Sequence, residues 1–165
     1  MKHILTFLSL TLFYAHTLYA DGPASWRTYP TDAVQPIFNI AKTLFRQSSP
    51  DYLITTRWET LEIQKRTIAG FYNLDVSVER YKFHVHEGEK PDTVTISLHI
   101  YTERDEVYSY LSADHFLHAL VWNRIDVALG TSQEWIDCKA FSVEKIWHHR
   151  NFLCALTPEK LSLLP

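Results

Sequence analysis

Apolar residues recur at helical spacing in the first third of the chain after residue 30. The apolar positions lie three or four residues apart, which is typical of one face of an amphipathic helix. The positions are Val34, Ile37, Phe38, Ala41, Leu44 and Phe45. We predict a helix that Thr31 or Asp32 caps, with Pro36 in its first turn, and that ends at residues 48–50, Ser-Ser-Pro.

A second helix is predicted from Ser112 to about Leu129, where Gly130 ends it. Its apolar positions again fall on one face. We expect the buried residues to be Ala113, Phe116, Leu117, Leu120, Val121 and Ala128.

Strict alternation of apolar and polar residues predicts the clearest strands. In residues 93–101, Val94, Ile96, Leu98 and Ile100 alternate with polar residues, as in a strand with one buried face. Residues 74–85 alternate as well, but the phase of the alternation changes near Glu79-Arg80, which predicts a β-bulge. With a turn at residues 87–92, the two runs form an antiparallel hairpin that has one apolar and one polar face.

Other segments give weaker patterns. Residues 52–72 fit a helical stripe or strands, and we favour two short strands. Residues 135–140 and 143–156 are interpreted as a second strand pair. Thr157-Pro158-Glu159 is a suitable start for a short C-terminal helix, whereas residues 21–30 show no apolar period and are interpreted as an extended lead-in.

This order of elements indicates a single α+β domain. We expect an antiparallel sheet of about five strands, with the N-terminal helix and the central helix packed on one face and a short helix at the C-terminus.

The first 20 residues have the parts of an export signal. Lys2 supplies a positive charge, residues 4–15 form an uncharged apolar run, and Ala20 offers a small residue for cleavage before Asp21. The apolar run is too short to span a bilayer, and no cysteine follows Ala20 to carry a lipid anchor. We therefore expect a signal peptide at residues 1–20, one exported domain at residues 21–165, no stable membrane anchor, and a periplasmic or secreted location.

Charge narrows the choice of partners. Cleavage removes Lys2, so 15 basic residues remain against 19 acidic ones, a net charge of −4 with neutral histidine. DNA, RNA and anionic membranes reward clustered Lys and Arg, so this balance argues against nucleic acid as a partner. Another protein or an envelope component is the expected partner.

The two cysteines, Cys138 and Cys154, would reach a compartment where disulfides persist. They form either one disulfide or two separate buried thiols, and the sequence does not decide between these alternatives. A bond would serve the scaffold and not catalysis.

Histidine stands out among residues that could carry chemistry, because seven of the nine histidines lie after residue 20. His84 and His86 are two apart on a predicted strand, so both rings lie on one face, a spacing that suits zinc or copper. No third ligand completes a known pattern, and the alternative is a solvated strand face with no cofactor.

The second helix carries two further candidates. Asp114 and His118 are four residues apart, as in half of an acid–base pair or in a surface ion pair near a helix start. Arg124 falls inside the apolar face, where it either pairs with a structural acceptor or lies at the floor of a pocket for a small anionic ligand. Helical geometry moves Trp122 off the buried centre, which makes it a candidate interface anchor.

These observations favour a non-catalytic, exported binding protein that uses a sheet face or a helix edge. A small metal-dependent or acid–base enzyme that uses the histidines is the first alternative. A carrier of a small anionic ligand around Arg124 is the second.

Overall fold

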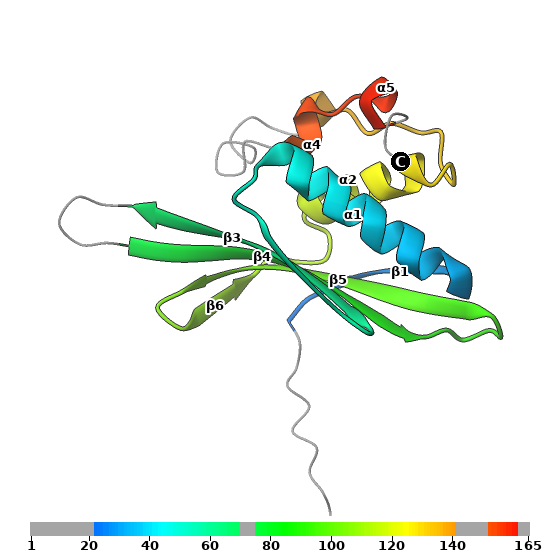
Figure 1. Ribbon diagram of the computed structural model, residues 1–165, viewed down its shortest axis with the longest axis horizontal. Helices are drawn as coiled ribbons and strands as arrows, with labels where there is room; N and C mark the ends of the chain where they lie inside the picture. The colour runs from blue at the N-terminus through cyan, green and yellow to red at the C-terminus, as the bar shows by residue number, and fades with distance from the viewer. Residues whose placement is uncertain (1–21, 70–74, 141–151, 162–165) are drawn as a thin grey trace, which may run out of the picture.

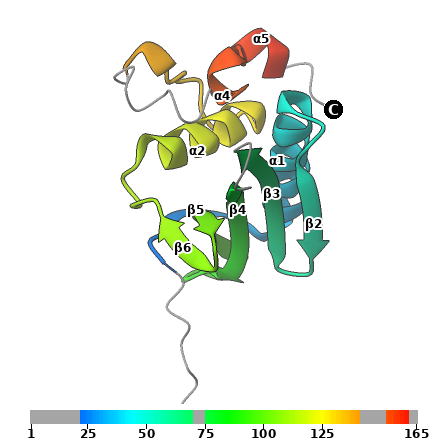
Figure 2. The same ribbon diagram turned by 90° about the vertical axis from the view of Figure 1, so that its left-hand side faces the viewer.

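The computed structural model describes residues 22–69, 75–140 and 152–161, and in these residues a six-stranded antiparallel sheet carries the helices on one face (Figures 1 and 2). The strands are β1 (Ser25–Pro30), β2 (Leu53–Arg57), β3 (Thr60–Ala69), β4 (Asp75–Glu87), β5 (Thr93–Arg104) and β6 (Val107–Tyr110). The helices are η1 (Thr31–Ala33), α1 (Val34–Ser48), α2 (Phe116–Ala128), η2 (Cys138–Ala140), α4 (Phe152–Ala155) and α5 (Pro158–Leu161). The predicted α+β class, with helices on one face of an antiparallel sheet, is confirmed. The predicted signal peptide lies outside the described residues.

The long hairpin of β4 and β5 forms the centre of the sheet. The strand order is β1-β5-β4-β3-β2, and β6 pairs with the part of β5 that lies beyond β1. The predicted hairpin is therefore confirmed, and residues 53–69 form the two strands favoured by the sequence. β1 and β6 were not predicted.

The predicted bulge near Glu79-Arg80 is wrong, because the pairing of β4 runs without interruption along both of its neighbours. The phase of the apolar pattern changes for another reason. The β3–β4 hairpin projects past the helices (Figure 1). In this part of the sheet the apolar residues Val76 and Val78 lie on the face away from the helices, and they pair with Ile68 and Arg66 of β3. The change of phase marks where the helix-covered part of the sheet ends.

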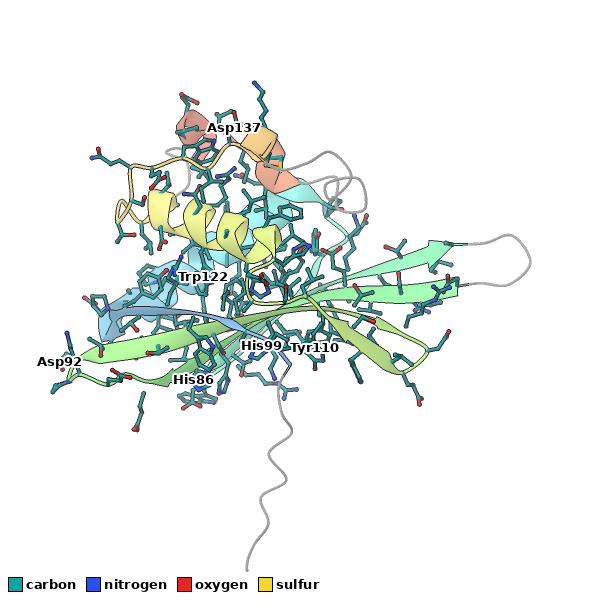
Figure 3. The ribbon with its side chains drawn as sticks, turned by 180° about the vertical axis from the view of Figure 1, so that it is seen from behind. His86, Asp92, His99, Tyr110, Trp122 and Asp137 are labelled. Atoms are coloured by element: carbon teal, nitrogen blue, oxygen red, sulfur yellow. A yellow bond between two sulfur atoms is a disulfide. The ribbon has the colours of Figure 1, made fainter. Side chains whose placement is uncertain are left out.

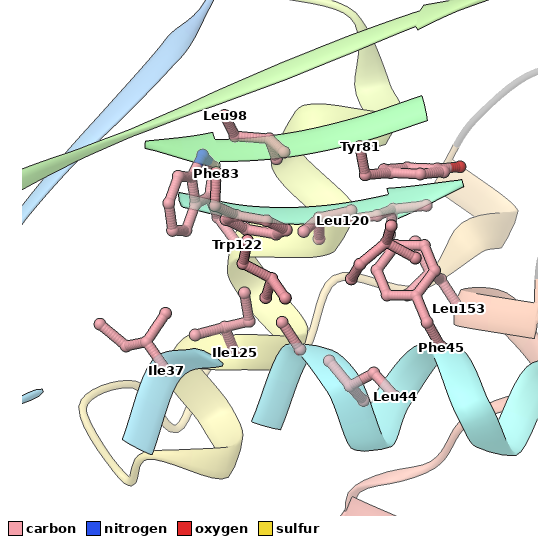
Figure 4. Packing of buried hydrophobic residues seen from close by; sticks show 14 of the residues in the cluster. Ile37, Leu44, Phe45, Tyr81, Phe83, Leu98, Leu120, Trp122, Ile125 and Leu153 are labelled. Carbon is pink, nitrogen blue, oxygen red and sulfur yellow. The ribbon is translucent and has the colours of Figure 1, made fainter. Parts of the chain in front are cut away.

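The core lies between the sheet and the helices, as Figure 4 shows in close-up. The predicted face of α1 is buried from Ile37 to Phe45, and the Phe45 ring packs edge-on against Tyr81, with the ring centroids 4.5 Å apart. From the sheet, Phe83 and Leu98 face each other across β4 and β5 and are fully buried. Each such side chain contributes about 2 kcal/mol on burial, so this layer holds the helices on the sheet.

The helix starts differ from the predictions. α1 follows the turn η1 and has Ala33 at its N-cap position without a side-chain hydrogen bond, so neither Thr31 nor Asp32 caps it. α2 begins at Phe116 and not at Ser112, because the imidazole of His115 accepts a hydrogen bond from the Leu117 N–H and caps the helix there. Ala113 consequently precedes α2 and is exposed, contrary to its predicted burial.

The predicted strand pair at residues 135–140 and 143–156 is also wrong for the described residues. Residues 135–137 have no regular structure, η2 follows them, and residues 152–155 form α4, while residues 141–151 lie outside the described part. Instead of pairing with a neighbouring strand, backbone carbonyl groups of these segments accept hydrogen bonds from side chains of α2. Asn123 donates to the carbonyl oxygen of Glu134, and Arg124 donates to those of Ile136 and Leu153. The short C-terminal helix is confirmed as α5.

No helix within the described residues is long and apolar enough to cross a membrane.

Candidate functional site

The strand register divides the side chains of the sheet between two faces. Side chains alternate along a strand, and Phe83 and Leu98 point to the helices, so their neighbours His84 and Ser97 point the other way. The register extends this row to Trp26 on β1 and Thr60 on β3. We call this side of the sheet, away from the helices, the open face. Figure 3 shows His86 on this side and Trp122 on the opposite side, between α2 and the sheet.

A row of three aromatic rings crosses the open face. The Trp26 and His86 ring centroids lie 4.9 Å apart, and those of His86 and His84 lie 4.4 Å apart. His86 Nε2 lies 3.0 Å from the hydroxyl oxygen of Ser97, which fixes the orientation of the central ring. Trp26, the second residue of β1, is 51% exposed. We call Trp26, His86 and His84 the ring row.

A hollow lies on each side of the ring row. The threonine hollow has a volume of about 450 Å³ and is lined by Thr28, Glu89, Lys90, Thr93 and Thr95. The basic hollow has a volume of about 330 Å³ and is lined by Thr55, Arg57, Thr60, Glu62, Lys82 and His84. Threonine side chains line both hollows, and the basic hollow is the more polar of the two. Together with the ring row, the hollows form a surface of rings and hydrogen-bonding groups.

Arg80 forms ion pairs with two glutamates next to the basic hollow. It lies in the middle of β4, and its guanidinium contacts Glu62 at 2.5 Å and Glu103 at 2.7 Å. Partial burial lowers the pKa of Arg80, but the hydrogen bonds and charges of Glu103 and Glu62 outweigh burial and raise the pKa above its usual value. The carboxylate of Glu62 is therefore already paired with Arg80, which it shares with Glu103.

The predicted pair of His84 and His86 does share one face of a strand. Among the described residues, no group of three or more His, Cys, Asp or Glu side chains gathers to hold a metal ion. The zinc or copper alternative thus stands on two imidazoles alone.

His118 is buried on the helix side of the sheet. Its Nδ1 lies 2.7 Å from the Ser25 hydroxyl oxygen, which also accepts a hydrogen bond from the Trp122 indole N–H at 2.7 Å. Burial, together with the charge of His115, lowers the pKa of His118 from 6.5 to about 4, although the Leu111 backbone and the charge of Asp114 act in the opposite direction. Asp114 itself is exposed and precedes α2.

Arg124 is 1% exposed, as its place in the apolar face predicts. Its guanidinium donates to the carbonyl oxygens of Leu153 at 3.0 Å and Ile136 at 2.9 Å, and to the Asn123 side chain. Burial lowers the pKa of Arg124 to about 10, partly opposed by the charge of Asp137, so the group is cationic at neutral pH. This geometry matches the alternative in which Arg124 pairs with structural acceptors, because oxygen atoms of the protein itself accept the hydrogen bonds of the guanidinium.

The prediction that Trp122 lies off the buried face is wrong. Trp122 is 1% exposed, and its indole packs edge-on against Phe83, with the centroids 5.8 Å apart. The prediction failed because α2 is buried on nearly all sides from Phe116 to Ile125, between the sheet, α1 and the C-terminal helices. A buried indole cannot anchor a partner.

Cys138 and Cys154 form a disulfide, with their Cα atoms 5.6 Å apart. The alternative of two separate thiols is thereby excluded. The bond joins η2 to α4.

Comparisons with known proteins show similarity at the level of structure only. No protein-family model matches this sequence, and no curated protein matches it. Among solved structures, the chain is similar to a DUF4468 family protein from Bacteroides ovatus ATCC 8483, with 14% sequence identity and a TM-score of 0.27. The match covers 53% of this chain and 59% of that protein, so it spans less than two thirds of either.

Sequence reasoning missed Trp26, the most exposed ring of the row. Residues 25–30 contain strand-forming Trp, Thr and Tyr, but Pro23 and Pro30 flank them and the apolar positions do not alternate. The signal appears only when β5 is known, because β1 is an edge strand that pairs along residues 93–98.

Proposed function

We propose that this protein is a non-catalytic binding protein outside the cytoplasm and that its open face binds a saccharide chain of the cell envelope. The observation that carries the proposal is the ring row of Trp26, His86 and His84 between two hydroxyl-lined hollows. An exposed indole offers a flat apolar surface to the C–H face of a sugar ring, while threonine and histidine groups exchange hydrogen bonds with sugar hydroxyls.

The polarity of the open face favours a saccharide over a protein partner. The centre of a protein interface is depleted of charged residues and enriched in large apolar ones. Here the basic hollow is lined by threonine hydroxyls, the His84 imidazole and charged residues, among them Lys82 and Glu62. Sugars carry a hydroxyl on almost every carbon, so they match such a surface.

The dimensions of the open face suit an extended ligand. Three strand spacings separate β1 from β3, a distance of roughly 14 Å. Trp26 lies on β1 at one side, and Trp58, which is 98% exposed, lies in the turn between β2 and β3 at the other. Two exposed indoles at opposite sides of a polar floor suit a short run of sugar rings.

Two observations support a location outside the cytoplasm. Residues 1–20 have the pattern of an export signal, and the Cys138–Cys154 disulfide is of a kind that persists in oxidising compartments.

The geometry gives less support to an enzyme that uses the histidines. Ser25 and His118 lie at the distance of a nucleophile and its base, but His118 is 1% exposed. The Trp122 indole N–H also donates a hydrogen bond to the Ser25 hydroxyl oxygen. This arrangement fastens β1 to α2 and does not present a nucleophile to a substrate.

A glycan array probed with the purified protein tests the proposal. We expect binding to a subset of bacterial envelope saccharides, and we expect Trp26→Ala to weaken that binding at least tenfold in isothermal titration calorimetry. Tyr108→Ala is the matched control, because Tyr108 is an aromatic residue of similar exposure (53%) on β6, away from the ring row. Binding to no saccharide, or equal affinities for the two variants, would refute the proposal.

A further inference from the structure

We infer that the basic hollow, lined by Thr55, Arg57, Thr60, Glu62, Lys82 and His84, holds an anionic group, a carboxylate or a phosphate, carried by the bound saccharide. This inference rests on the proposed function and adds the chemical class of the ligand. It also places an anion site on the open face, at a distance from the buried Arg124.

Arg57 is the residue that carries the inference. It lies at the end of β2, is exposed, and has no ion pair with another described residue. A guanidinium that has no internal acceptor keeps its five donors for a ligand, and its planar fork matches carboxylate and phosphate oxygens.

The acidic residue in the hollow does not cancel this charge. Glu62 is held at 2.5 Å by Arg80, which lies outside the residues that line the hollow. Lys82 lies opposite Glu62 in the register of β3 and β4 and is the second cationic residue of the lining. Arg57 and Lys82 outnumber the one carboxylate of the lining, Glu62, so the hollow has an excess of positive charge, which an anionic group complements.

The backbone holds these groups in place before a ligand binds. β2 and β3 set Arg57 opposite Thr60 and Thr55 opposite Glu62, and β3 and β4 set Thr60 opposite His84. The hydroxyls of Thr55 and Thr60 therefore flank the cationic groups at fixed positions. Preorganised donors lower the entropic cost of binding.

The positive charge is a local feature and not a property of the whole chain, whose net charge after residue 20 is −4. In the threonine hollow, the charges of Glu89 and Lys90 balance each other. We therefore assign the anionic part of the saccharide to the basic hollow and its uncharged part to the ring row and the threonine hollow.

The test compares saccharides that differ only in charge. A glycan array with matched neutral, carboxylated and phosphorylated saccharides is probed first. The best matched set is then titrated by calorimetry against the wild type, Arg57→Gln, and Arg46→Gln as the control, an exposed arginine on α1 outside both hollows. We expect Arg57→Gln to weaken binding of the charged saccharide roughly tenfold while affinity for its neutral counterpart changes less than twofold. Arg46→Gln should leave both affinities within twofold, and the carboxylated and phosphorylated arms identify which anion is bound.

Two results would overturn the inference while leaving the proposed function intact. One is an Arg57→Gln variant that binds charged and neutral saccharides as the wild type does. The other is a variant that loses both equally while its melting temperature is unchanged. If no saccharide binds the wild type at all, the proposed function fails and the inference fails with it. Thermal melting of each variant separates loss of binding from loss of fold.

Discussion

The guanidinium of Arg124 stacks on the indole of Trp135, with its central carbon 3.5 Å from the ring centroid. The same guanidinium donates to the carbonyl oxygens of Ile136 and Leu153. Ile136 lies two residues before the half-cystine Cys138, and Leu153 lies directly before Cys154. One side chain of α2 and one disulfide therefore tie the same two segments together. The described residues of the C-terminal segment, 135–140 and 152–161, are held by these ties.

Replacement of Arg124 by Met should therefore be strongly destabilising. The change keeps the apolar stem but leaves two buried carbonyl oxygens without donors, and each unsatisfied group costs about 1–3 kcal/mol. We expect the free energy of unfolding to fall by about 3 kcal/mol or more in urea denaturation under oxidising conditions.

Arg27→Met is the matched control for this change. Arg27 is an exposed arginine whose contact with Asp126 is long, at 3.9 Å, and such surface pairs contribute under about 1 kcal/mol. Similar losses for the two variants would show that Arg124 does not hold the C-terminal segment.

Removal of the disulfide should destabilise the same region. Cys138 and Cys154 are 16 residues apart, and closing a loop of this size contributes about 3 kcal/mol in the chain-entropy account. We expect the Cys138→Ala, Cys154→Ala variant to unfold at lower urea concentration, and reductant to lower the stability of the wild type without affecting the variant. A wild type whose mass does not rise by two hydrogens on reduction would contradict the bond itself.

The sequence predicted the parts of the fold that depend on local periodicity. The strict alternation of Val94, Ile96, Leu98 and Ile100 became the central strand, and the apolar face of residues 34–45 became α1. Prediction from the sequence failed for the segments whose structure depends on contacts with residues far away in the chain. Ile136 belongs to no strand because Arg124 and Asn123 take up the backbone hydrogen bonds around it.

The candidate site follows the same division. The shared face of His84 and His86 was predictable, because the period of a strand is two for any partner. Trp26 joins them through the pairing of β1 with β5, and Arg57 is aligned with His84 through two strand pairings across β3. Register between distant strands is set by the packed core, so no local pattern near Trp26 or Arg57 announces the site.

Cleavage of the leader gives a prediction that is independent of the ligand. We expect the exported protein to begin at Asp21, with a mass lower than that of the full chain by residues 1–20. Intact-mass measurement of protein from the periplasm or the medium of an expressing bacterium checks this. Replacement of residues 8–11, Leu-Ser-Leu-Thr, by four charged residues should abolish cleavage and retain the protein in the cytoplasm. An uncleaved wild type would remove the case for export.

The stability of the domain should fall as the medium becomes acidic, through His118. Its pKa in the folded protein is about 4, because burial disfavours the charged ring, against 6.5 in the unfolded chain. Between pH 6.5 and 4 the unfolded state binds a proton that the folded state does not, so the free energy of unfolding declines by about 3 kcal/mol across this window and by no more below it.

Carboxylates titrate in the same range, so the measurement is the difference between wild type and His118→Gln in urea denaturation at pH 7, 5.5 and 4. The difference should shrink or reverse on acidification. A pH-independent difference for His118→Gln would mean that the ring titrates normally and that its burial carries no electrostatic cost.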